Sequence, residues 1–182
     1  CFGKRVGGGS GIGELMRDLG EALAGEVEFK MLGGGQPAHI PEVVEAWRKR
    51  WLEIESEGKL PVVLGNYEPP AGNRGFRAKL SAMLKREFGW NVGPENVAVT
   101  SGGQTAFFML FNALAGEMPN GSRKKILLPL VPEYIGYTDQ SVGSDLFEVR
   151  RPKIEKTGRH EFKYTIDFEN LDLSDEIAAI CV

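Results

Sequence analysis

The fold is decided by the stretch Val97-Ala-Val-Thr-Ser-Gly-Gly-Gln-Thr-Ala-Phe-Phe-Met-Leu-Phe-Asn-Ala-Leu114. Its first three residues place β-branched valines on either side of an alanine, which is typical of a strand. Beyond the glycine pair, apolar residues recur with the spacing of a helix that packs on a core: Ala106, Phe107, Leu110, Phe111 and Leu114. The stretch therefore predicts a strand at 97–99, a glycine turn and a helix at 104–114.

The turn at residues 100–105 has the composition of an anion site. Its polar residues can cap the helix, and its glycines let an anion approach the backbone closely. Unpaired N–H groups and the positive end of the helix dipole would hold a phosphate there. A glycine turn between a strand and a helix is also common without any ligand, so the motif alone leaves both interpretations open.

Further strands follow this helix. Apolar runs predict strands at 126–130, at 145–149 and at 177–182. Strands that alternate with helices indicate an α/β protein with an open parallel sheet and helices on its faces. Because the last run is apolar throughout and no turn or helix follows it, we expect a truncated chain that lacks later parts of the sheet. The alternative is a small complete α/β domain with an unprotected last strand.

The first half of the chain is helical in pattern. Residues 10–23 carry an apolar stripe, and Ser10 is a candidate N-cap. A second helix is predicted from Pro41 to about Gly58, with proline in its first turn and glycine after its end. A third is predicted at 74–88.

Composition excludes several classes of function. The chain has 182 residues, 42% of them hydrophobic and 26% charged, which is typical of a globular protein. A net charge of -3 gives no electrostatic footprint for nucleic acid. No apolar run approaches the roughly 20 residues that cross a bilayer, and the N-terminus lacks the pattern of a signal peptide. We therefore expect a cytoplasmic protein without nucleic-acid or membrane partners. Cys1 and Cys181 lack the spacing of a metal site.

Four motifs in order resemble the class I/II, fold-type I aminotransferases, which depend on pyridoxal 5′-phosphate (PLP). They are Leu32-Gly-Gly-Gly-Gln-Pro-Ala-His-Ile-Pro41, residues 64–77, Thr100-Ser-Gly-Gly-Gln-Thr-Ala-Phe-Phe108 and Leu128-Pro-Leu-Val-Pro-Glu-Tyr-Ile-Gly-Tyr137. The resemblance implies an aspartate aminotransferase-like fold. Residues 1–62 would form an N-terminal arm and helices of the small-domain or interdomain part, and residues 63–182 the first part of the PLP-binding large domain.

The resemblance also implies roles for particular residues. Gly103 and Gln104 would donate backbone N–H groups to the PLP phosphate, and Thr105 would add its hydroxyl. Tyr134 matches the aromatic residue that stacks on the pyridine ring, and Tyr67 the tyrosine that reaches the phosphate of the neighbouring subunit. Gly34 and Gly35 match the glycines near the substrate carboxylate. Each residue also has an interpretation without a ligand. Tyr134 could be a half-buried tyrosine after a strand, Tyr67 a turn tyrosine before two prolines, and the two glycines part of a flexible loop.

The lysine that holds the cofactor as a Schiff base in this family has no counterpart in the chain; its Ser-x-Ser-Lys context is missing. By resemblance, the activity is transfer of an amino group between a small aliphatic amino acid and a 2-oxo acid such as pyruvate, in a homodimer. These 182 residues alone would be an inactive N-terminal portion. Two alternatives stay open at this point: a non-catalytic domain on the same scaffold, or another fold-type I enzyme such as a lyase or synthase.

Overall fold

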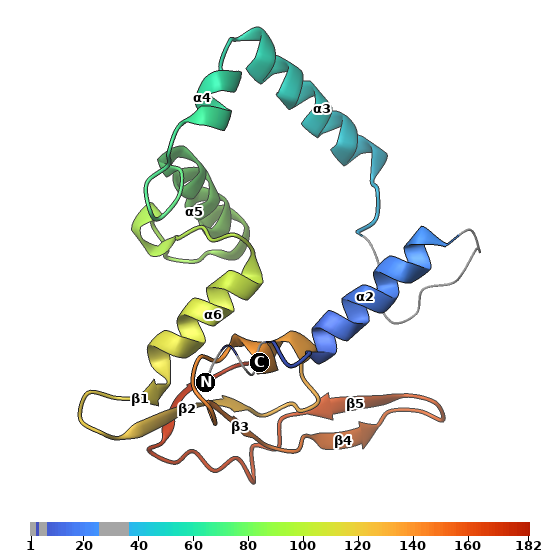
Figure 1. Cartoon of the computed structure of the whole chain (residues 1–182), viewed down its shortest axis with the longest axis vertical. Helices are drawn as coiled ribbons and strands as arrows, with labels where there is room; N and C mark the ends of the chain where they lie inside the picture. Colours follow the sequence, from blue (N-terminus) through green and yellow to red (C-terminus); the bar gives the residue numbers. More distant parts are fainter. Residues whose placement is uncertain (1–2, 4–6, 26–36) are drawn as a thin grey trace. The chain divides into compact units, whose positions relative to one another are not determined.

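The computed structural model describes Gly3 and residues 7–25 and 37–182, and it is an α/β structure (Figure 1). These residues divide into two compact units. One unit comprises Cys1–Leu23 and Ser101–Val182, and the other comprises Ala24–Thr100. The domain boundary that we expect between residues 62 and 63 in the complete protein stays a prediction.

The first unit is organised around a sheet whose central strand is β2 (Arg123–Leu128). It pairs in parallel with β3 (Phe147–Val149) and β6 (Ile177–Ile180), and antiparallel with the short β1 (Gly116–Glu117). The parallel pairs confirm the open parallel sheet predicted from the sequence. β3 is shorter than predicted because Asp145 has a φ of 61°, which a strand residue cannot have.

Helix α6 (Gly103–Leu114) forms a hydrophobic core with this sheet. Phe111 from the helix and Ile126 and Leu128 from β2 are buried, as are Ala115 and Leu146. Ile126 is completely inaccessible to solvent. Truncation of a buried phenylalanine such as Phe111 to alanine typically costs about 3–5 kcal/mol, so this contact anchors α6 firmly.

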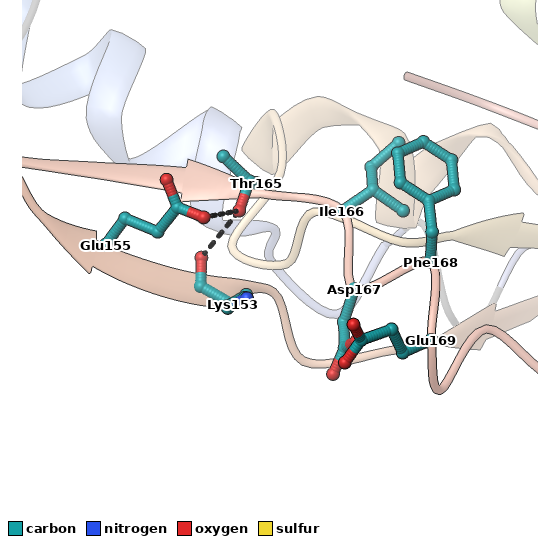
Figure 2. Close-up of a pocket in the computed structure, with 7 residues that line it drawn as sticks. All are labelled: Lys153, Glu155, Thr165, Ile166, Asp167, Phe168 and Glu169. Atoms are coloured by element: carbon teal, nitrogen blue, oxygen red, sulfur yellow. Dashed lines mark hydrogen bonds between the residues drawn. The ribbon is translucent and has the colours of Figure 1, made fainter.

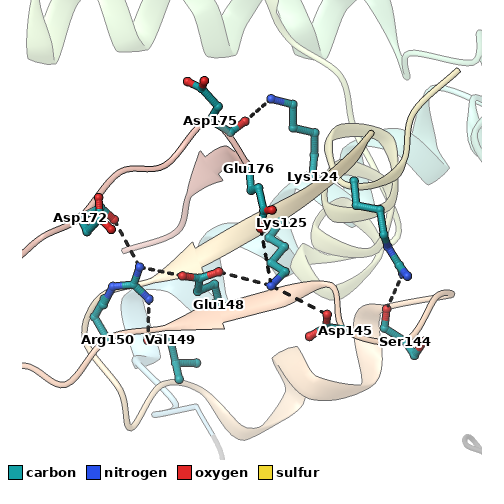
Figure 3. Close-up of polar contacts among 11 residues, drawn as sticks. Lys124, Lys125, Ser144, Asp145, Glu148, Val149, Arg150, Asp172, Asp175 and Glu176 are labelled. Carbon is teal, nitrogen blue, oxygen red and sulfur yellow. Dashed lines mark hydrogen bonds and ion pairs between the residues drawn. The ribbon is translucent and has the colours of Figure 1, made fainter. Parts of the chain in front are cut away.

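Charged side chains gather beside the strands, as Figure 3 shows. Lys125 and Glu148 alternate along β2 and β3 with the core residues Ile126 and Phe147, so they leave the sheet on its other side. The Lys125 ammonium lies 3.4 Å from the Glu148 carboxylate, and the Arg150 guanidinium lies 2.6 Å from it. The Lys125–Glu148 pair links β2 and β3, and the Arg150–Glu148 pair lies along β3.

The same unit contains further elements. Helix α2 (Gly11–Ala24) begins as predicted, because the Ser10 hydroxyl accepts a hydrogen bond from the Gly13 amide at 3.1 Å. The short 3-10 helix η2 (Ile135–Gln140) contacts α6. Strands β4 (Lys153–Lys156) and β5 (Phe162–Thr165) form an antiparallel hairpin, which the sequence analysis did not predict.

The second unit is helical: α3 (Pro41–Ser56), α4 (Leu60–Gly65), α5 (Arg74–Phe88) and the 3-10 turn η1 (Pro94–Asn96). The predicted bounds of α5 are confirmed. Asn73 caps the helix by accepting a hydrogen bond from the Phe76 amide at 3.0 Å. Gly89 ends it with a φ of 69°, a left-handed conformation that glycine adopts readily.

The predicted strand at 97–99 is wrong, since these residues are extended but join no sheet in the described structure. Their backbone groups find other partners. The Val99 amide donates to the Ala71 carbonyl at 3.1 Å, and the Arg77 guanidinium donates to the carbonyls of Pro94 and Val97 at 3.0 and 3.5 Å. These bonds replace those that a neighbouring strand would make.

No helix within the described ranges has the length and apolar character needed to cross a membrane.

Candidate functional site: the start of helix α6 and Tyr134

Helix α6 begins with a set of free backbone donors. Its N-cap, Gly102, has φ 92° and ψ 167°, a conformation that side-chain-bearing residues rarely adopt. The first amide to bond back along the chain is that of Ala106, which donates to the Gly102 carbonyl at 3.3 Å. The amides of Gly103, Gln104 and Thr105 precede it and have no carbonyl within the helix to reach. Three N–H groups therefore point out of the helix at its positive end.

The surroundings of these donors are open. A β-carbon built on Gly102 or Gly103 would meet no atom within 4 Å. Residues 101–104 are all exposed. An anion can consequently approach the backbone directly, without moving a side chain.

The hydroxyl of Thr105 has a partner within the turn. It donates a hydrogen bond to the Ser101 carbonyl at 3.2 Å. This bond ties Thr105 back to the turn before the helix. The hydroxyl oxygen can still accept a hydrogen bond, but its proton is already used. A phosphate oxygen at this position would need the hydroxyl to rotate away from Ser101.

Tyr134 is held by an aromatic cluster that starts in the core. Its ring meets that of Tyr137 edge-on at a centroid distance of 5.5 Å. Tyr137 in turn packs against Phe107 and Phe111 of α6, at 4.9 and 5.6 Å. Tyr134 itself is 48% exposed, so part of the residue is accessible to a ligand.

Tyr134 and Gln104 come together at Gly136, which is buried. A β-carbon at Gly136 would lie 2.5 Å from Cε1 of Tyr134 and 2.7 Å from Nε2 of Gln104. Both side chains therefore border the same small space. The structure thus brings the expected ring-stacking residue next to the helix start that is expected to bind phosphate.

Burial raises the pKa of the Tyr137 phenol above its ordinary value, and the nearby Cys181 thiol adds to the effect. Tyr137 is therefore neutral at physiological pH. Its ring supports Tyr134 as an uncharged group.

The remaining predicted residues stay predictions. Tyr67 belongs to the other unit, where its side chain is fully exposed. Gly34 and Gly35 lie outside the described residues.

The sequence analysis missed two residues that shape the site. Gly136 is one. The other is Asn112 of α6, whose amide nitrogen donates to the Gln140 carbonyl at 2.6 Å and whose oxygen accepts from the Val142 amide at 2.8 Å. These bonds fasten both ends of the turn after η2 to the helix. Asn112 could have been found from the sequence as a lone asparagine among apolar helix residues, because a partly buried side-chain amide needs hydrogen-bond partners.

Two pockets formed by described residues are lined by residues other than those expected to bind the cofactor. One of about 300 Å³ lies at the base of the β4–β5 hairpin, as Figure 2 shows. Another of about 250 Å³ lies between the apolar side of α6 and β6. The start of α6 itself, residues 101–104, is exposed to solvent.

The residues present fit part of PLP. The three outward amides suit a phosphate, because a helix N-terminus supplies directed donors and positive potential. The half-exposed Tyr134 ring suits a flat heterocycle. The Gln104 side chain at the helix start and the Tyr134 ring border the same space at Gly136, which links the two features.

Comparisons with known proteins identify relatives of this chain. No family model matches the chain. The valine–pyruvate aminotransferase of Escherichia coli (strain K12) is 42% identical over 181 residues, which cover 100% of this chain and 43% of that protein. The crystal structure of valine–pyruvate aminotransferase from Salmonella typhimurium LT2 has a TM-score of 0.74 and 41% identity, covering 94% of this chain and 40% of that one.

A putative amino-acid aminotransferase from Psychrobacter arcticum 273-4 has a TM-score of 0.86 and 36% identity, covering 99% of this chain and 45% of that chain. The chain spans less than half the length of these relatives. The comparisons confirm the resemblance and the fold class that the sequence motifs predict.

Proposed function

We propose that this chain, a member of the fold-type I aminotransferases, is the N-terminal portion of an enzyme. That enzyme would move an amino group between an amino acid and a 2-oxo acid. The amino donor would be a small aliphatic amino acid such as valine, and the acceptor a 2-oxo acid such as pyruvate. The relatives named for valine and pyruvate support this choice, since they match along 94–100% of the chain.

One structural observation carries the proposal: α6 starts with the outward amides of Gly103, Gln104 and Thr105, and the Gln104 side chain at this start shares the space at Gly136 with the half-exposed Tyr134. The amides would hold the phosphate of PLP, and Tyr134 would lie on its ring and fix its orientation. When bound, PLP supplies an electron sink for the reaction at the amino-acid α-carbon. This part of the chain would therefore bind and orient the cofactor.

The residues that move protons would come from elsewhere in the enzyme. Two lysines near the core are already engaged: Lys124 donates to the Asp175 carbonyl, and Lys125 pairs with Glu148 at 3.4 Å. We therefore assign neither to the reaction. The 182 residues alone would lack the lysine that the reaction needs and would be inactive.

Further features belong to the proposal. Tyr67 would reach the phosphate of a neighbouring subunit, and Gly34 and Gly35 would leave room for the substrate carboxylate. A homodimer and a cytoplasmic location complete it. The exposure of Tyr67 supports a role in contact with another chain, because a phenol on a turn can donate one hydrogen bond across an interface.

The complete protein, loaded with PLP, should convert valine and pyruvate into 2-oxoisovalerate and alanine. Alanine formation by chromatography measures this directly. A matched reaction with the 182-residue chain should form no alanine. If the complete protein binds PLP but forms no new amino acid from any pair of amino acid and 2-oxo acid, aminotransfer is the wrong reaction.

A further inference from the structure

Gly136 stands at the meeting point of the two candidate cofactor contacts. It is buried in η2, and Tyr134 and Gln104 approach it from different elements. A β-carbon there would lie 2.5 Å from the Tyr134 ring, a separation that real β-carbons do not show. Any larger residue would therefore displace the Tyr134 ring, the side-chain amide of Gln104 or both.

Position 136 requires glycine because there is no room for a β-carbon, and not because of its backbone conformation. The φ of Gly136 lies outside the left-handed region, so an alanine could adopt the same backbone conformation. Of the two neighbours, the end of the Gln104 side chain can swing away at little cost. The Tyr134 ring is rigid, and Tyr137 packs against its edge. A β-carbon at Gly136 would thus act mainly on the position of Tyr134.

The backbone around Gly136 is fixed independently of this contact. The Gln140 side chain donates to the Gly136 carbonyl at 3.3 Å, and Asn112 of α6 donates to the Gln140 carbonyl at 2.6 Å. Tyr137, the next residue, packs its ring on Phe107. The turn is therefore held on α6 at several points, and the open side of Gly136 faces Tyr134 and Gln104.

We propose that Gly136 is a positioning residue that sets how closely the Tyr134 ring lies to the start of α6, and so matches the spacing between the ring and the phosphate of PLP. The inference rests on the proposed function. It goes beyond it by naming a residue that touches no cofactor atom and acts through Tyr134.

The test uses the complete protein without PLP and titrates it with pyridoxamine 5′-phosphate, followed by tryptophan fluorescence. This compound keeps the ring and the phosphate but forms no Schiff base with a lysine. Gly136→Ala should raise the Kd about tenfold. Gly143→Ala is the matched control, because a β-carbon at Gly143 would meet no atom within 4 Å. Its Kd should equal that of the unchanged protein.

A double-variant cycle separates positioning from a general structural role. Tyr134→Ala should by itself raise the Kd about tenfold. The double variant Tyr134→Ala with Gly136→Ala should be no weaker than Tyr134→Ala alone, since the displaced ring is then absent. A structural role for Gly136 predicts instead that the two losses multiply to about a hundredfold, and this result would overturn the proposal.

The remaining outcomes also decide the matter. If Gly136→Ala fails to fold, the double variant, which lacks the colliding ring, should fold and bind like Tyr134→Ala; failure of both to fold would contradict the inference. If Gly136→Ala binds like Gly143→Ala, the inference is wrong while the proposed function stands. If the unchanged protein binds neither pyridoxamine 5′-phosphate nor PLP, the proposed function itself fails.

Discussion

A glycine at a helix start can serve an unusual backbone conformation or leave room for a ligand, and Gly103 tests the second role alone. Its φ lies outside the left-handed region and a β-carbon would meet no atom, so Gly103→Ala should leave the protein as stable or slightly more stable. A methyl group on the first residue of α6 would nonetheless stand where a phosphate approaches the amides. We expect the Kd for pyridoxamine 5′-phosphate to rise about tenfold, or about 1.4 kcal/mol.

The comparison with pyridoxamine, which lacks the phosphate, makes this prediction specific. Its binding should be the same in Gly103→Ala and in the unchanged protein. An equal loss for both compounds would place the methyl group against the ring, and no loss for either would move the phosphate away from α6.

At the scale of the element, the cap of α5 makes a local contribution that can be measured. Asn73 accepts a hydrogen bond from the Phe76 amide at 3.0 Å and donates one to the Glu68 carboxylate at 2.8 Å. Asn73→Ala removes both, and the loss of such a cap typically costs about 1 kcal/mol. Urea unfolding should show this decrease. Asn91→Ala, at an exposed asparagine after the same helix, should change the free energy of unfolding by less than about 0.5 kcal/mol.

The caps also explain which elements could be predicted from the sequence. The predicted bounds of α5 are confirmed, and in the structure Asn73 and Gly89 set its ends by local hydrogen bonding and local conformation. The hairpin β4–β5 was missed because each strand has four residues that are mostly polar and exposed. The strand at 97–99 was wrong because pairing depends on a distant partner, and Arg77 and Ala71 took its backbone bonds.

The same reasoning applies to the candidate site. The helix start was predictable, since its glycines and polar residues are contiguous. The nearness of Tyr134 to Gln104 was inferred only through family resemblance, because 30 positions of sequence separate them. It depends on how η2 packs on α6 through Tyr137 and Phe107. The role of Gly136 needs side-chain coordinates, since nothing local to it shows what lies opposite.

At the scale of the whole molecule, the ion pairs across the sheet make stability depend on pH. The hydrogen bond from Arg150, with a second from Lys125, lowers the pKa of the Glu148 carboxyl below its ordinary value of 4.5. A lowered pKa in the folded state stabilises the fold when the carboxyl is ionised. The contribution is therefore full above about pH 4.5 and is lost as the pH falls through the folded value.

Glu148→Gln should consequently lower the free energy of unfolding by about 1 kcal/mol near neutral pH. The difference from the unchanged protein should shrink steadily below about pH 4.5, as Glu148 becomes protonated and so neutral, like the glutamine that replaces it. Urea unfolding at a series of pH values measures it. Glu21→Gln, at an exposed position of α2, makes the same change in charge and should show no such trend. A difference that stays constant down to low pH would mean that the Glu148 charge does not stabilise the fold.

The central claim is that the start of α6 holds the phosphate of PLP and that Tyr134 covers its ring. A crystal structure of the complete protein grown with PLP tests it most directly. We predict phosphate oxygens within about 3 Å of the amide nitrogens of Gly103 and Gln104, and the Tyr134 ring stacked on the pyridine ring. A phosphate bound elsewhere, with these amides facing solvent or other protein groups, would contradict the account.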